Sequence, residues 1–64
     1  MEEIEQFTGQ NYWNAYDALQ AAVSKYGLST SLIEPNLDFN IDVDPTRLKV
    51  FVDSNSIIIG FKQG

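Results

Sequence analysis

The chain has 64 residues, of which 9 are acidic and 4 are basic, so its net charge is −5, and it contains neither cysteine nor histidine. This length predicts a single small domain over residues 1–64. The missing residue types exclude disulfides, Cys/His zinc sites and the common nucleophile–base pairs of hydrolases. We therefore expect a binding protein that is not an enzyme and holds no cofactor or metal.

The scarcity of basic side chains also bears on partners. Nucleic acids and anionic membranes are bound through clustered Lys and Arg, so neither is an expected partner. No apolar run approaches the roughly 20 residues of a membrane span, and the acidic start lacks the pattern of a signal peptide. We expect a monomer that is either cytoplasmic or the mature form of a secreted protein.

The first predicted element is a helix over residues 11–25. Its apolar residues recur at three- and four-residue steps and form one stripe, made of Tyr12, Ala15, Tyr16, Leu19, Ala22, Val23 and Tyr26. Asn11 is the expected N-cap, Lys25 suits the last turn, and Gly27 suits a left-handed stop. Four aromatic residues cluster in or near this helix, Tyr12, Trp13, Tyr16 and Tyr26, and we expect most of them to pack against the core.

Three strands are predicted after the helix, over residues 28–34, 48–53 and 57–61. The run of isoleucines in the last strand predicts that this strand is well buried. In the second, Leu48, Val50 and Val52 share one face, while Lys49 and Phe51 share the other. Turn-forming residues 53–56 predict an antiparallel hairpin between the last two strands. Together these elements predict an α+β fold, in which one helix packs on a small mixed β-sheet.

The segment between Pro35 and Pro45 alternates apolar and polar residues, which favours a half-buried strand. The alternative is a long extended loop, and loops of this length in compact domains are usually functional. Residues 38–42 match the opening of a calcium loop, but Val43 and Lys49 stand where that loop needs Gly and Glu. A solvated acidic face explains these carboxylates better than a metal site does.

Two basic residues, Arg47 and Lys49, lie two positions apart on a predicted strand and so share a face. By itself this spacing indicates an ordinary solvated sheet face. The run from Arg47 to Asp53, however, resembles the R-V-R-L-F-V-D strand of the potato inhibitor I family of serine protease inhibitors, which includes barley chymotrypsin inhibitor. Gly9 through Ala15 is similar to the start of that family's helix, and Pro35 and Gly64 are similar to the residues that open its binding loop and close its chain.

In that family a hydrophobic residue at the reactive position is followed by Glu or Asp and lies six residues before the first arginine of the strand. Ile41, followed by Asp42, stands at this distance from Arg47. The resemblance therefore implies a long extended reactive-site loop with its scissile bond at Ile41–Asp42. It assigns the loop to Asp38, Phe39, Asn40, Ile41, Asp42 and Val43, and the support of the loop to Arg47, Lys49 and Lys62.

The implied partner is a serine protease of the subtilisin or elastase type, because the mid-sized Ile41 suits such pockets better than that of trypsin. Asn40 and Lys49 differ from the family pattern, which has Thr and Arg at these places. Two other functions stay open at this point. The chain could be a non-inhibitory protein-binding module that uses the acidic extended segment 36–44, or a small enzyme that uses its carboxylates.

Overall fold

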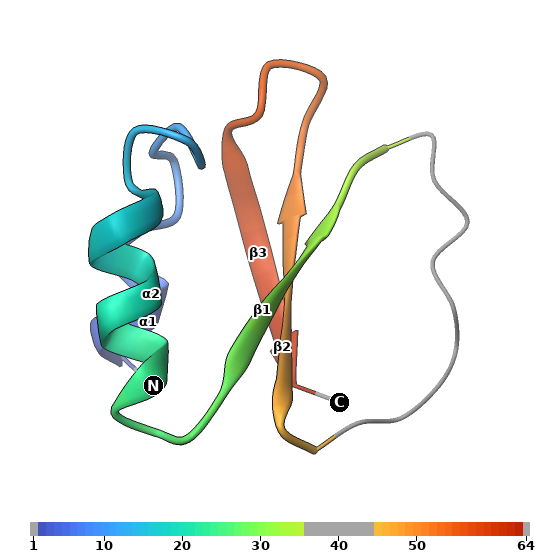
Figure 1. Ribbon diagram of the computed structural model, residues 1–64. Helices are drawn as coiled ribbons and strands as arrows, with labels where there is room; N and C mark the ends of the chain where they lie inside the picture. The colour runs from blue at the N-terminus through green and yellow to red at the C-terminus, as the bar shows by residue number, and fades with distance from the viewer. Residues whose placement is uncertain (1, 36–44, 64) are drawn as a thin grey trace.

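A computed structural model describes residues 2–35 and 45–63 and shows two layers, with the helices on one side of a three-stranded sheet (Figure 1). In chain order the elements are α1 (Glu2–Glu5), α2 (Tyr16–Ser24), β1 (Ser29–Ile33), β2 (Arg47–Val52) and β3 (Ile58–Gln63). The predicted α+β fold with a helix on a mixed sheet is confirmed. Neither helix is long and apolar enough to cross a membrane within the ranges described.

The sheet has the order β1-β2-β3, with β1 parallel and β3 antiparallel to the central strand. The predicted hairpin between β2 and β3 is therefore confirmed. In it, Asp53 accepts hydrogen bonds at Oδ1 from the backbone N–H groups of Asn55 (2.8 Å) and Ile57 (3.0 Å). Ser56 completes the turn in the left-handed region, with φ of 62°. The polar turn residues thus fold as their chemistry predicts.

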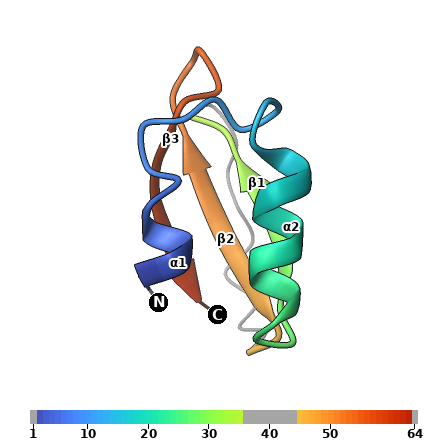
Figure 2. The same ribbon diagram turned by 90° about the vertical axis from the view of Figure 1, so that its left-hand side faces the viewer.

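The core lies between the helices and one face of the sheet. Figure 2 shows α1 and α2 side by side in front of that face. From β2 it takes Leu48, Val50 and Val52, the three side chains that alternation predicts for one face. Its other members come from α1, α2, β3 and the connecting turns: Ile4, Phe7, Tyr12, Ala15, Leu19, Ala22, Val23 and Ile58. The short helix α1, which the sequence pattern did not predict, supplies Ile4.

The second helix begins later than predicted, at Tyr16 rather than after Asn11. Asn11 does cap the backbone, because its Oδ1 accepts hydrogen bonds from the N–H groups of Trp13 (2.9 Å) and Asn14 (3.1 Å). These residues form turns instead of regular helix, and Ala15 breaks the helical dihedrals with φ of −94° and ψ of 1°. The predicted left-handed stop at Gly27 is confirmed by its φ of 71°.

Two predictions about burial were wrong. Trp13, Tyr16 and Tyr26 are 60%, 39% and 48% exposed, so of the aromatic residues near the helix only Tyr12 is in the core. The last strand is also less buried than its run of isoleucines indicated. A β-bulge shifts the register between Phe51 and Val52, and Ile59, which has no partner in that register, is 60% exposed.

Candidate functional site

The three basic residues expected to support a loop lie on one face of the sheet. In the register, Lys49 lies between Ser31 of β1 and Lys62 of β3, and Arg47 lies beside Ser29. Side chains of directly paired strand residues point to the same face, and those two apart on one strand do too. Because Leu48 and its alternates face the helices, this basic face is the one turned away from them.

The three cations of the basic face, which we define as Arg47, Lys49 and Lys62, differ sharply in burial. Lys49 is only 7% exposed, Arg47 is half-buried, and Lys62 is exposed. A lysine is rarely this buried unless its charge is compensated. Lys49 also stands directly across the strands from Lys62, an arrangement of like charges that destabilises a sheet on its own. Negative charge close to this face would stabilise it, because it would compensate the charge of Lys49 and reduce the repulsion between Lys49 and Lys62.

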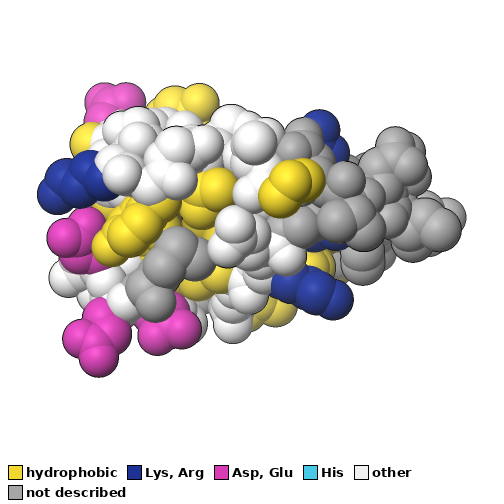
Figure 3. Space-filling view, turned by 90° about the horizontal axis from the view of Figure 1, so that it is seen from below, with side chains coloured by type: hydrophobic (Ala, Val, Ile, Leu, Met, Phe, Trp, Pro, Cys, Tyr) yellow, Lys and Arg dark blue, Asp and Glu magenta, His cyan; other side chains and the backbone are white. Residues whose placement is uncertain are grey.

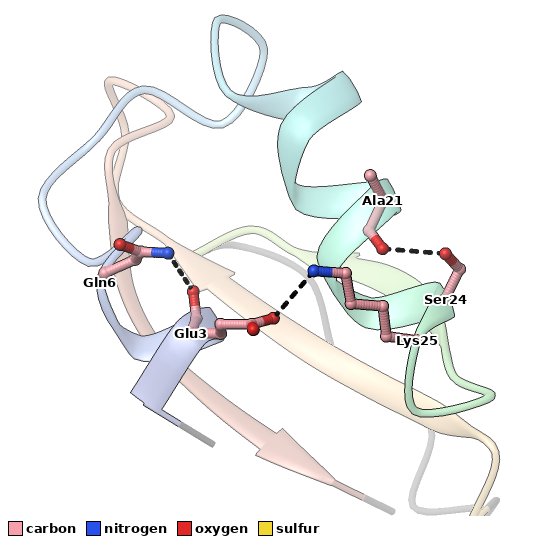
Figure 4. Close-up of polar contacts among 5 residues, drawn as sticks. All are labelled: Glu3, Gln6, Ala21, Ser24 and Lys25. Atoms are coloured by element: carbon pink, nitrogen blue, oxygen red, sulfur yellow. Dashed lines mark hydrogen bonds and ion pairs between the residues drawn. The ribbon is translucent and has the colours of Figure 1, made fainter.

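The strands themselves do not provide that charge. On the same face, β1 contributes Ser29, Ser31 and Ile33, and β3 contributes Gly60 beside Lys62, so no carboxylate is among the strand residues that the structure describes there. The fourth cation of the chain, Lys25, is used elsewhere. Its Nζ lies 3.6 Å from a carboxylate oxygen of Glu3 in a solvent-exposed pair between α1 and the end of α2 (Figure 4).

Acidic side chains are plentiful in the helical layer instead. All three charged residues of α1, Glu2, Glu3 and Glu5, are acidic and exposed. Seen from below, Asp and Glu side chains gather at one side of the molecule, whereas Lys and Arg also lie toward the other side (Figure 3). Among the described residues, acidic and basic side chains are therefore not mixed evenly over the surface.

The residues predicted to form the reactive-site loop are Asp38, Phe39, Asn40, Ile41, Asp42 and Val43, and all of them lie outside the described residues. The stem that follows them, which we define as Pro45 and Thr46, is held by hydrogen bonds. The backbone O of Thr46 accepts a hydrogen bond from the N–H of Ser29 (2.8 Å), and the backbone O of Pro45 accepts one from Nε2 of Gln63 (3.0 Å). The chain thus enters β2 from a point fixed to both of its neighbouring strands.

The ends of β1 and β2 also constrain the connection between these strands. They run parallel, with Ile33, the last residue of β1, paired to Phe51 rather than to Arg47. The last residue of β1 and the first residue of β2 therefore lie about 13 Å apart along the strand direction, which is the length of four strand residues.

Comparison with models of known protein families gives no match, and comparison with curated proteins gives none either. The basic face therefore has to be interpreted from its own geometry. Strand alternation correctly predicted that Arg47 and Lys49 share a face, and the structure adds Lys62 to it. Alternation could not predict the burial of Lys49, although its position between Leu48 and Val50 places it at the centre of the sheet.

Proposed function

We propose that this protein is a serine protease inhibitor with a substrate-like reactive-site loop over residues 38–43 and a scissile bond at Ile41–Asp42. The observation that carries the proposal is the basic face, with buried Lys49 at its centre. Arg47 and Lys49 follow Ile41 by six and eight residues, so the cations lie on the strand that immediately continues the proposed loop. The expected target is a protease of the subtilisin or elastase type.

The proposal gives the basic face a function. Proteases bind an extended backbone and place successive side chains in pockets, so Ile41 would fill the primary pocket. Asn40 and Asp42, on either side of it, would point back toward the scaffold. There Arg47 and Lys49 can donate charge-assisted hydrogen bonds, each of which contributes about 1.5–3 kcal/mol when shielded from water. Negative charge from Asp42 would also offset the repulsion between Lys49 and Lys62.

Rigidity separates such an inhibitor from a good substrate. Ordering a loose loop on binding costs about 0.5–1.5 kcal/mol per immobilised side chain, and a loop held in advance avoids that cost. The same hold keeps the new amino group of Asp42 next to the acyl-enzyme after cleavage, so that re-forming the bond competes with hydrolysis. Because the chain has no cysteine, the ionic contacts, the Pro45 and Thr46 stem and the core have to supply this stiffness.

The test is inhibition of trypsin, chymotrypsin, pancreatic elastase and subtilisin by the intact chain, with Arg47→Ala and Lys25→Ala as paired variants. We expect inhibition of elastase or subtilisin, and much weaker inhibition of trypsin. Arg47→Ala should raise the rate of cleavage at Ile41–Asp42 and weaken inhibition about tenfold or more, which is the loss of at least one shielded charge-assisted hydrogen bond.

Lys25→Ala is the matched control, because it removes an equal charge from the exposed pair with Glu3, away from the basic face. It should leave inhibition unchanged. Equal cleavage of both variants and the parent would contradict the supporting function of Arg47. Full activity of all four enzymes, with cutting of the chain at several bonds, would instead favour the non-inhibitory binding module that uses segment 36–44.

A further inference from the structure

A second exposed feature lies at the start of α2 and shares no residue with the basic face. Three rings meet there to form an aromatic patch, which we define as Tyr12, Trp13 and Tyr16. The rings of Trp13 and Tyr16 stack with centroids 6.2 Å apart and planes at 25°. Buried Tyr12 meets both edge-on, at 4.9 Å from Trp13 and 5.6 Å from Tyr16. A core residue thus holds two exposed rings in place.

The backbone under the patch is also fixed. The N–H of Tyr12 donates to the backbone O of Ser56 (2.8 Å), and Asn11 forms a bridge to Ile57 just before β3. The Asn11 side chain caps the turn that carries Trp13. Because the rings and the backbone are already held in place, few groups of this protein need to become ordered when a partner binds, and the entropic cost of binding is lower. Trp and Tyr held in this way are the residue types that dominate binding energy at protein interfaces.

The charges at this end of the molecule indicate what kind of partner fits. The start of α2, the end of β1 and the hairpin turn all lie at the upper end in Figure 1. Asp17 lies in the first turn of α2, Glu34 directly follows β1, and Asp53 begins the hairpin turn, and no Lys or Arg is described in these segments. Lys25 follows the far end of α2, and Arg47 lies at the far end of β2. In that first turn of α2, Asp17 comes directly after Tyr16.

We propose that the aromatic patch binds a cationic segment of a partner protein, with an arginine or lysine side chain lying over the exposed rings of Trp13 and Tyr16. Cations are attracted to the faces of aromatic rings, most strongly to that of Trp. Asp17 adds charge attraction and offsets the partial positive charge at the start of the helix. A second copy of this chain fits poorly, because each copy carries a charge of −5. The inference does not depend on protease inhibition.

The experiment is a calorimetric titration of the whole chain with a short peptide of alternating Arg and Gly, and with the same peptide carrying neutral citrulline for Arg. Trp13 is the sole tryptophan, so a change in its fluorescence reports contact in the parent protein. We expect the arginine peptide to bind and to shift this fluorescence, and the citrulline peptide to bind far more weakly. Trp13→Ala should raise Kd about 2- to 30-fold, the range of one cation–π contact.

Tyr26→Ala is the matched control, because Tyr26 is an exposed aromatic residue beyond the other end of α2. It should leave Kd unchanged, and circular dichroism should show that both variants fold. The proposal is overturned if neither peptide binds, if both bind equally, or if Tyr26→Ala weakens binding as much as Trp13→Ala. It is also overturned if ultracentrifugation shows a dimer that Trp13→Ala dissociates, since the patch would then bind a second copy.

Discussion

Replacing Lys49 with Met tests whether the buried cation of the basic face supports inhibition. The Met side chain is one heavy atom shorter than that of Lys and carries no charge, so most of the volume at this 7% exposed position stays filled. If Lys49 holds the proposed loop through one shielded charge-assisted hydrogen bond, about 1.5–3 kcal/mol is lost. The inhibition constant should then rise about 10- to 150-fold, and cleavage at Ile41–Asp42 should accelerate.

Lys62→Met is the matched control, because Lys62 lies directly opposite Lys49 on the same face and is exposed. An exposed ionic contact contributes about 0–1 kcal/mol, so this change should raise the inhibition constant less than about fivefold. The assay is steady-state inhibition of subtilisin, with urea unfolding of each variant in parallel. Equal effects of the two substitutions, or a loss of inhibition that only follows a loss of stability, would refute the reasoning.

Three further predictions concern the scaffold, each measured as a free energy of unfolding in urea. Leu19→Ala should lower the free energy of unfolding by about 2–5 kcal/mol, because Leu19 is fully buried. Trp13→Ala, at an exposed position, should lower it far less. Similar losses for the two variants would contradict the described core. Asp53→Ala should cost about 1–3 kcal/mol through its two hydrogen bonds in the turn, and Asp53→Asn less, since one oxygen acceptor remains. Ser56→Gly should stabilise by about 0.5–1 kcal/mol, because φ of 62° strains a residue with a side chain, whereas Ser54→Gly should give no gain.

The strands could be predicted because their sequence signal matches a local physical requirement. Leu48, Val50 and Val52 alternate with Lys49 and Phe51, and a strand between a core and another face needs this pattern. Asp53 and the polar residues after it supply the hydrogen bonds of a tight turn. The α+β class and the hairpin followed from these segments and from the helical stripe.

The helical region was predicted less well, since periodicity does not show where a small core ends. Tyr16 and Tyr26 continue the stripe of Leu19 and Val23, yet they remain exposed beside a sheet of three strands. The break at Ala15 has no sequence signal, because alanine is a strong helix former. The four-residue helix α1 is too short to show a period at all.

For the candidate site, strand alternation predicted the shared face of Arg47 and Lys49 but not the burial of Lys49. Alternation assigns a side chain to a face, whereas burial depends on what the rest of the chain places over that face. Residues 38–43 lie outside the described part of the chain, so the assignment of Ile41 remains a prediction.

The most direct test starts from the chain cut at Ile41–Asp42 and purified in its cleaved form. This form is incubated with a small amount of the active protease that the intact chain inhibits. If cations hold both sides of the reactive-site loop in place, the protease should re-form the Ile41–Asp42 bond. Mass spectrometry should then show that samples begun from the cleaved form and from the intact form reach the same mixture of both forms. If the cleaved chain stays cleaved and is degraded further, the basic face does not hold the loop, and the chain is not this kind of inhibitor.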